Sequence, residues 1–173
     1  MSERSREMLC KALELAENAV EFYEKTLASC SKGLAMDVFA MLRKDAEAGR
    51  ESVQAIHDEI AGGAAWSAAC SLPDEDVRDL KAVLGEMARA HGGESCPASE
   101  KDALGQAMAM EDHIRSFYQE SLAAAEDGVE KAFLERMVRE SHSHYLLLAD
   151  TQYYYEDPEG WSLKAGKAGL DGA

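Results

Sequence analysis

The stretch ALELAENAVEFY, residues 12–23, has a counterpart later in the chain in ALGQAMAMEDHIRSFY, residues 103–118. Both stretches end in a Phe-Tyr pair, and each is followed by a second helix-forming stretch. Such a duplicated pair of helical stretches is typical of a four-helix bundle, which builds its site from side chains on facing helices. Aligning the two Phe-Tyr pairs places Ala16 against Glu111, so the second copy has a carboxylate where the first has a methyl group.

The composition indicates one all-α domain. The chain has 173 residues, which is enough for a single domain with a complete core. It is 46% hydrophobic, contains only three prolines, and is rich in alanine, leucine, glutamate and methionine. Long stretches of strong helix formers without helix breakers predict helices throughout the chain.

The charge narrows the possible partners. The net charge of −15 argues against nucleic acid, because binding phosphates requires a basic surface, and it argues equally against anionic membrane surfaces. No apolar run approaches the ~20 residues that a membrane span requires, and the first residues lack the apolar centre of a signal peptide. We therefore expect a cytoplasmic protein. The four cysteines form no CxxC pair, which favours reduced, mostly buried thiols over a zinc or iron–sulfur site.

Apolar residues at steps of three and four predict four long helices. The expected ranges are 3–29, 34–60, 99–126 and 129–155. Between the second and third helices, a long crossover at 62–98 carries a short extra helix from about 73 to 90. A crossover of this length allows the third helix to run parallel to the second. Residues 1–158 are thus expected to form a single bundle, followed by a glycine-rich C-terminal tail, 159–173, that packs only through Trp161.

Three polar residues interrupt the apolar seams near the middle of the predicted bundle: Glu111, Ser141 and His144. Ser141 and His144 are three residues apart and so share one face of the fourth helix. A buried carboxylate and a buried imidazole need partners, because an unpaired buried charge is costly. One interpretation is a hydrogen bond or ion pair between Glu111 and His144, with Tyr23 and Tyr118 supplying further donors.

The alternative interpretation of the same residues is metal ligation, since glutamate and histidine both suit iron, manganese or zinc. Glu111 and His144 would then be the ligands. Two protein ligands make a poor site, so a competent one would also recruit Glu140, Glu17, Asp45 or water. The expected metal content is accordingly at most one equivalent of iron.

The chain as a whole resembles the rubrerythrin family of ferritin-like proteins. The resemblance covers the two Phe-Tyr helices, the two helices that follow them, the crossover, and the ending HYLLLADTQYYYEDPEGW, residues 144–161, followed by AGLDGA, residues 168–173. It implies a ferritin-like four-helix bundle with a di-iron site, in which two helices each supply a glutamate and the other two each supply a Glu-x-x-His motif. It also implies iron-dependent peroxide or oxygen chemistry in a homodimer.

Most of the ligand positions of that family are occupied here by residues that bind metal poorly or not at all. The replaced positions are Ala16 in the first helix, Ala46 and Gly49 in the second, and Ser141 in the fourth. Glu111 in the third helix and His144 in the fourth are the two of six that remain. The chain also lacks the CxxC pair of the family's rubredoxin module.

These observations predict a rubrerythrin-like protein whose di-iron site is largely lost. The main hypothesis is a non-catalytic protein that binds or interacts with a protein partner or a small ligand. One alternative is a residual iron-binding oxidoreductase of the rubrerythrin type that uses Glu111 and His144. Another is a carrier that holds a small molecule or haem in the vacated space. These hypotheses leave open whether the protein is an enzyme.

The replacements also remove side-chain volume from one layer of the predicted bundle. Protein interiors pack at a density near ~0.75, so the layer should close or fill. We expect neighbouring side chains to fill it in preference to an open pocket. The candidates are Phe39, Leu42, Met108 and Met137.

Overall fold

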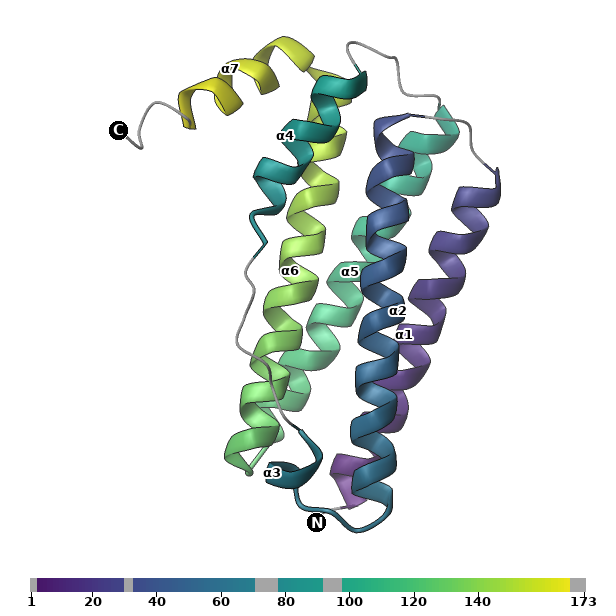
Figure 1. Cartoon of the computed structure of the whole chain (residues 1–173), viewed down its shortest axis with the longest axis vertical. Coiled ribbons are helices and arrows are strands. Elements are labelled where there is room, and N and C mark those ends of the chain that lie inside the picture. The colour runs from purple at the N-terminus through teal and green to yellow at the C-terminus, as the bar shows by residue number, and fades with distance from the viewer. Residues whose placement is uncertain (1–2, 30–32, 71–77, 92–97, 169–173) are drawn as a thin grey trace.

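The computed structural model describes residues 3–29, 33–70, 78–91 and 98–168, and within these ranges the chain is all-helical and without strands, as predicted. Four long helices lie side by side (Figure 1). They are α1 (Glu3–Ser29), α2 (Leu34–Ala61), α5 (Ala98–Ala124) and α6 (Gly128–Glu156). The shorter helices are α3 (Trp66–Ala69), α4 (Leu80–His91) and α7 (Pro158–Ala168). None of the described helices combines the length and the apolar character needed to cross a lipid bilayer.

The four long helices follow the predicted apolar seams. Each begins and ends within two residues of its expected range. The helix α1 packs along α2, and α5 packs along α6. Asp127 begins α6, because its Oδ1 accepts hydrogen bonds from the backbone N–H groups of Val129 at 2.8 Å and Glu130 at 3.1 Å. A side chain in this position satisfies donors that the first turn of a helix leaves unpaired.

The crossover helix begins later than predicted, and the short α3 before it was not expected. The predicted start at Pro73 lies outside the described residues, while Arg78 and Asp79 are described and are not helical. Asp79 caps α4, since its Oδ1 accepts hydrogen bonds from the backbone N–H groups of Lys81 at 3.1 Å and Ala82 at 3.0 Å. The helix then packs against both α2 and α6.

The C-terminal tail contains a helix that the sequence analysis does not predict. The helix α7 begins at Pro158, which suits a first turn because that turn needs no N–H from it. Asp157 Oδ1 accepts a hydrogen bond from the Gly160 N–H at 2.9 Å. A Cβ at Gly160 would collide with the Asp157 carboxylate, so this glycine serves packing and does not mark a loop. The expected contact of Trp161 is present, with its ring edge-on to Tyr154 at a centroid distance of 5.3 Å. The prediction that the tail packs only through Trp161 is wrong, because Lys164 Nζ also lies over the Tyr153 ring, 5.6 Å from its centroid.

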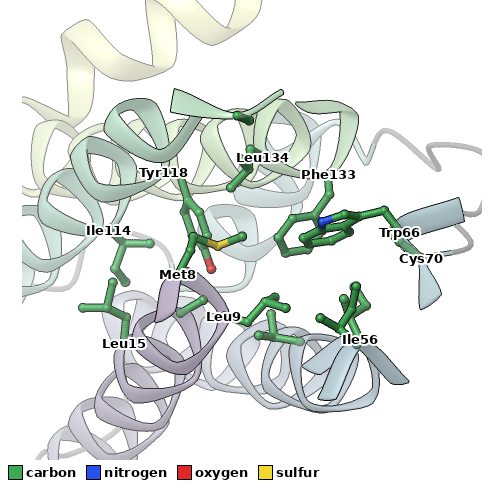
Figure 2. Close-up of a cluster of buried hydrophobic side chains, with 14 of the residues drawn as sticks. Met8, Leu9, Leu15, Ile56, Trp66, Cys70, Ile114, Tyr118, Phe133 and Leu134 are labelled. Carbon is green, nitrogen blue, oxygen red and sulfur yellow. The ribbon is translucent and has the colours of Figure 1, made fainter. Parts of the chain in front are cut away.

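The apolar core divides into two clusters along the bundle. The Trp66 cluster, which includes Leu9 and Phe133 (Figure 2), joins the first half of α1 to the second half of α2. The Phe39 cluster, which includes Leu148, joins the other halves of these helices. The same division runs through α5 and α6. A stretch of each long helix therefore lies between the two clusters.

The prediction of reduced, mostly buried thiols holds for one of the two described cysteines. Cys70 is a buried free thiol, as expected, whereas Cys10 is a free thiol exposed on α1. Cys30 and Cys96 lie outside the described residues. Cys10 is exposed because it neighbours the buried Leu9 on the outward side of α1, where a helix turns away from the core.

Candidate functional site

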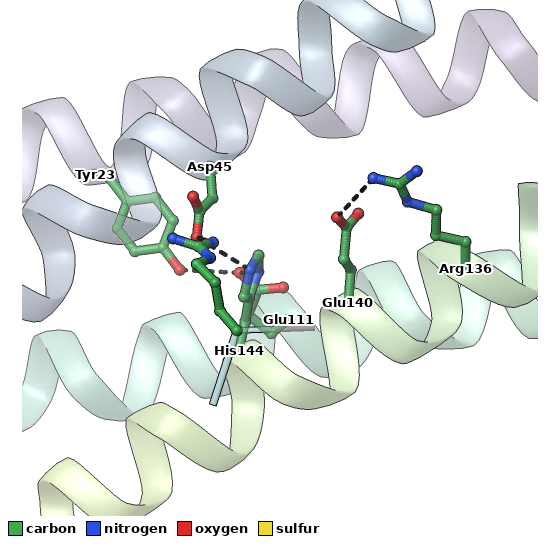
Figure 3. Close-up of polar contacts among 7 residues, drawn as sticks. Tyr23, Asp45, Glu111, Arg136, Glu140 and His144 are labelled. Carbon is green, nitrogen blue, oxygen red and sulfur yellow. Dashed lines mark hydrogen bonds and ion pairs between the residues drawn. The ribbon is translucent and has the colours of Figure 1, made fainter. Parts of the chain in front are cut away.

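Polar side chains from all four long helices meet inside the bundle, and Figure 3 shows their contacts. We call this group the polar layer; its members are Tyr23 on α1, Asp45 on α2, Glu111 on α5 and His144 on α6. Side-chain exposure is 5% for Glu111, 16% for His144 and 19% for Asp45, so these three ionisable groups are largely shielded from water. Each long helix thus contributes one polar side chain at the same level of the bundle.

Glu111 and His144 meet inside the bundle, which confirms the predicted pairing of these two side chains. His144 Nδ1 lies 3.4 Å from Glu111 Oε1, and His144 Nε2 lies 3.7 Å from Asp45 Oδ2. The Tyr23 hydroxyl donates a hydrogen bond to the same Glu111 oxygen at 3.0 Å. Of the two tyrosines expected as donors, Tyr23 therefore has that role, whereas Tyr118 lines an adjoining cavity.

The contacts of His144 favour its charged form. Burial alone would lower the pKa of the imidazole, but contacts with Asp45 and Glu111 outweigh burial and raise the pKa from 6.5 to about 10. Carboxylates only accept hydrogen bonds, so an imidazolium with an N–H on each ring nitrogen matches both partners. Burial, and then the Glu111 carboxylate, raise the pKa of Tyr23 well above its usual value, so the phenol keeps its proton.

A second cation reaches the polar layer from the crossover. Arg78 Nη2 lies 2.5 Å from Asp45 Oδ2. Burial would raise the pKa of Asp45, but contacts with His144 and Arg78 hold it below its usual 3.8, so the carboxylate stays ionised. Arg78 is not among the predicted site residues. No periodicity marks this residue, and only the packing of α4 against α2 and α6 brings it to Asp45.

The residues at this level do not fit a di-iron site. The four replaced positions, Ala16, Ala46, Gly49 and Ser141, supply no carboxylate or imidazole. The Ser141 hydroxyl donates a hydrogen bond to the Met137 carbonyl of its own helix at 3.0 Å. A metal needs a lone pair on the imidazole, yet both nitrogens of His144 face carboxylates. Within the described ranges, no three His, Cys, Asp or Glu side chains are grouped so that they could hold a metal ion.

The residues that a metal site would have to recruit are dispersed. Asp45 belongs to the polar layer, where it is paired with His144. Glu140 borders the adjoining cavity, and its carboxylate lies 3.8 Å from Arg136. Glu17 is exposed on α1. Metal ligation by Glu111 and His144 therefore stays a prediction.

A cavity of about 60 Å³ adjoins the polar layer. Its lining includes the four positions at which the resemblance would place further metal ligands: Ala16, Ala46, Gly49 and Ser141. Of the four side chains expected to fill the space, Met137 lines it, while Phe39, Leu42 and Met108 pack in the Phe39 cluster. The filling prediction is therefore wrong for these three, because the cluster already holds them. A space of this size accommodates a few water molecules or one end of a small ligand.

A groove of about 360 Å³ adjoins the cavity. The two spaces share four lining residues: Asp45, Gly49, Met137 and Glu140. The groove is bordered by α2 and α6 and by α3 at one end, with Phe133 and Cys70 among its walls and Arg78 and Arg136 as its cations. A Cβ at Gly49 would meet no atom within 4 Å, so there is room for a side chain at this shared lining position.

Comparisons of the chain with protein-family models, with curated proteins and with solved structures find no match. The resemblance to rubrerythrins accordingly rests on the residues and spacings of the chain itself.

Proposed function

We propose that this chain is a ferritin-like bundle of the rubrerythrin type, in which the di-iron layer has become a non-catalytic binding site for a small molecule. The order of the helices supports this proposal, because the α1–α2 and α5–α6 pairs are joined by a long crossover, as in that fold (Figure 1). The register supports it as well. All six positions that the resemblance assigns to metal ligands border a single cavity.

The cavity in the former ligand layer is the observation that carries the proposal. Small-molecule sites are concave and mostly apolar, with a few polar groups that orient the ligand. Leu15, Ile114 and Met137 supply apolar wall, while Glu111 and His144 supply a polar end. A layer that served stability alone would be expected to fill, because an open cavity lowers the free energy of unfolding.

The pairing of charges supports a non-catalytic role. Glu111 is engaged by Tyr23 and His144, and Asp45 is engaged by His144 and Arg78. Capturing a metal cation would break these pairs and leave buried partners without counter-charges, which is strongly unfavourable. The replaced positions offer no carboxylate to compensate for that loss.

Iron titration tests the proposal directly. Protein purified without added metal is titrated with ferrous iron under anaerobic conditions, desalted, and analysed for bound iron. We expect no stoichiometric retention, because four of the six ligand positions are replaced. Two equivalents retained per chain would overturn the proposal. One equivalent would overturn it in favour of a residual iron site at Glu111 and His144.

A variant with restored ligands provides the matched control. It combines Ala16→Glu, Ala46→Glu, Gly49→His and Ser141→Glu, which recreates the pattern that the resemblance assigns to the family. This variant should retain two equivalents of iron in the same assay. If it folds, as judged by circular dichroism, and still holds no iron, then the relation to rubrerythrins is wrong.

A further inference from the structure

The sizes of the cavity and the groove indicate how a ligand would lie, given the proposed binding function. Small-molecule sites commonly enclose about 300–1,000 Å³. The cavity of about 60 Å³ is too small for a complete ligand, whereas the adjoining groove of about 360 Å³ falls within that range. The two spaces are neighbours, because Asp45, Gly49, Met137 and Glu140 line both of them. A ligand that uses both spaces has its body in the groove and one end in the cavity.

The charges around these spaces are balanced. Three carboxylates and three cations border them: Asp45, Glu111 and Glu140, with Arg78, Arg136 and His144. Every one of the six lies in an ion pair with another member of the set. The three charges at the inner end, Asp45, Glu111 and His144, are only 5–19% exposed, so an ionic group placed there would displace one of these partners or remain unpaired, and both are costly. The groove charges Arg78, Arg136 and Glu140 are 29–49% exposed and are already paired. The inner end therefore favours a neutral group.

The polar end of the cavity offers an acceptor. Both contacts of the Glu111 carboxylate, from Tyr23 and His144, are made to Oε1. Among the residues that the structure describes, no side chain donates a hydrogen bond to Oε2 of this carboxylate, and Glu111 borders the cavity. A ligand hydroxyl that donates to Oε2 would satisfy this oxygen, and hydrogen bonds to charged groups are among the stronger ones. In the groove, Phe133 and Met137 offer an aromatic ring and a thioether to an apolar body.

From these observations, we propose that the site binds a small neutral molecule with an apolar body and a terminal hydroxyl. The hydroxyl lies in the cavity and donates to Glu111, and the body lies in the groove between α2 and α6 beside Met137.

Three probes of similar shape and different charge test this ligand class: benzyl alcohol, benzoate and benzylammonium. Binding is followed by NMR through the methyl group of Met137, which lines both spaces. Benzyl alcohol should shift this signal saturably, with an affinity at least about tenfold above that of either ion, because a tenfold difference corresponds to only ~1.4 kcal/mol. Preferential binding of benzoate would overturn the neutral-ligand inference and indicate an anion site at Arg78 and Arg136. No binding of any probe would also overturn it.

Two glycine variants locate the binding. Gly49→Leu places a side chain at the lining position shared by cavity and groove and should abolish the shift caused by benzyl alcohol. Gly105→Leu is the matched control, because Gly105 is an exposed helical glycine on α5 with open space around it and does not border either space. An unchanged affinity in Gly49→Leu would place the probe elsewhere and overturn the inference.

A chemical measurement checks the same point without NMR. Cys70 borders the groove and Cys10 is exposed on α1, away from it. Benzyl alcohol should slow alkylation of Cys70 by iodoacetamide by up to about twofold at half-saturating concentration, where half of the sites are occupied, and leave Cys10 unaffected, with peptide mapping to separate the sites. Equal effects on both thiols would contradict binding in the groove. Because iron retention is measured separately, failure of these probes is distinguishable from failure of the proposed function.

Discussion

The Trp66 cluster and the polar layer both draw on the four long helices, with α3 adding Trp66 to the cluster, yet they bury their side chains in different ways. In the cluster, Phe133 packs against Trp66 at a centroid distance of 5.8 Å and edge-on against Tyr118 at 6.4 Å. In the layer, His144 lies between two carboxylates, and a cavity remains beside it. The comparison shows that close packing and open, charged space can alternate within a few turns of the same helices.

If the proposed binding function is right, this difference places stability and ligand binding at different levels of the bundle. Apolar clusters gain free energy in proportion to the surface that they remove from water. Charged side chains in a shielded layer gain little net free energy, because desolvation offsets their attraction. The clusters therefore supply most of the stability, and the layer is the region that can carry a ligand at a tolerable loss of stability.

The largest expected loss of stability follows from a truncation in the Trp66 cluster. Phe133→Ala should lower the free energy of unfolding by about 3–5 kcal/mol, because it removes a ring that is 2% exposed and leaves a cavity. Urea denaturation followed by circular dichroism measures the change. Leu146→Ala serves as the control, since Leu146 is 50% exposed and its truncation should have little effect. Equal losses in both variants would show that the cluster is not the stabilising core.

A smaller loss is expected when a charge is removed from the polar layer. Glu111→Gln keeps the shape of the side chain but removes the charge that faces His144, and should cost about 2–3 kcal/mol. Adding His144→Gln removes the stranded cation, so the double variant should lose less than the sum of the single losses. The double-mutant cycle in urea measures this coupling. Strict additivity would mean that the two groups do not interact.

The same pair should make stability depend on pH. The pKa of His144 is raised in the folded protein from 6.5 to about 10, so the folded state holds this proton more tightly than the unfolded chain. The resulting stabilisation is fully present below pH 6.5 and is lost as the pH rises through about 10. Urea midpoints across this window should fall for the natural protein and fall less for His144→Gln. Parallel curves for the two proteins would show that His144 does not carry the effect.

The smallest expected effect is an increase in stability on replacing Gly49. Gly49→Ala should raise the free energy of unfolding by about 0.5–1 kcal/mol, because alanine is the better helix former and its methyl group meets no atom within 4 Å. Gly160→Ala should instead destabilise α7, where a Cβ would collide with Asp157. Thermal melts of both variants make the comparison. A loss of stability in Gly49→Ala would mean that the layer is more tightly closed than the cavity indicates.

The long helices could be predicted because each repeats an apolar seam over many turns, so no single residue decides their position. The short helices could not. The helix α7 is glycine-rich and depends on Asp157 and on the contact between Trp161 and Tyr154. The start of α4 depends on Asp79, whose cap is a local hydrogen bond without any periodicity.

The site was predictable to the extent that its residues lie on those seams. Glu111 and His144 stand out as polar interruptions, so their meeting could be inferred from helical geometry alone. Arg78 lies on no seam and reaches Asp45 only through the packing of α4. Predicting the cavity would require knowing whether neighbouring side chains are free to move into the space. The Phe39 cluster already holds Phe39 and Leu42, and sequence periodicity does not contain that information.

The polar layer also fixes the position of each long helix along the bundle axis. Apolar seams repeat every three or four residues, so a helix that slides by one turn, about 5.4 Å, would still present apolar side chains to its neighbours. The same slide would carry Glu111 away from Tyr23 and His144, or Asp45 away from Arg78, and leave shielded charges without partners. Because each long helix contributes one member, a one-turn shift of any of the four helices would break a polar contact in the layer and destabilise the bundle.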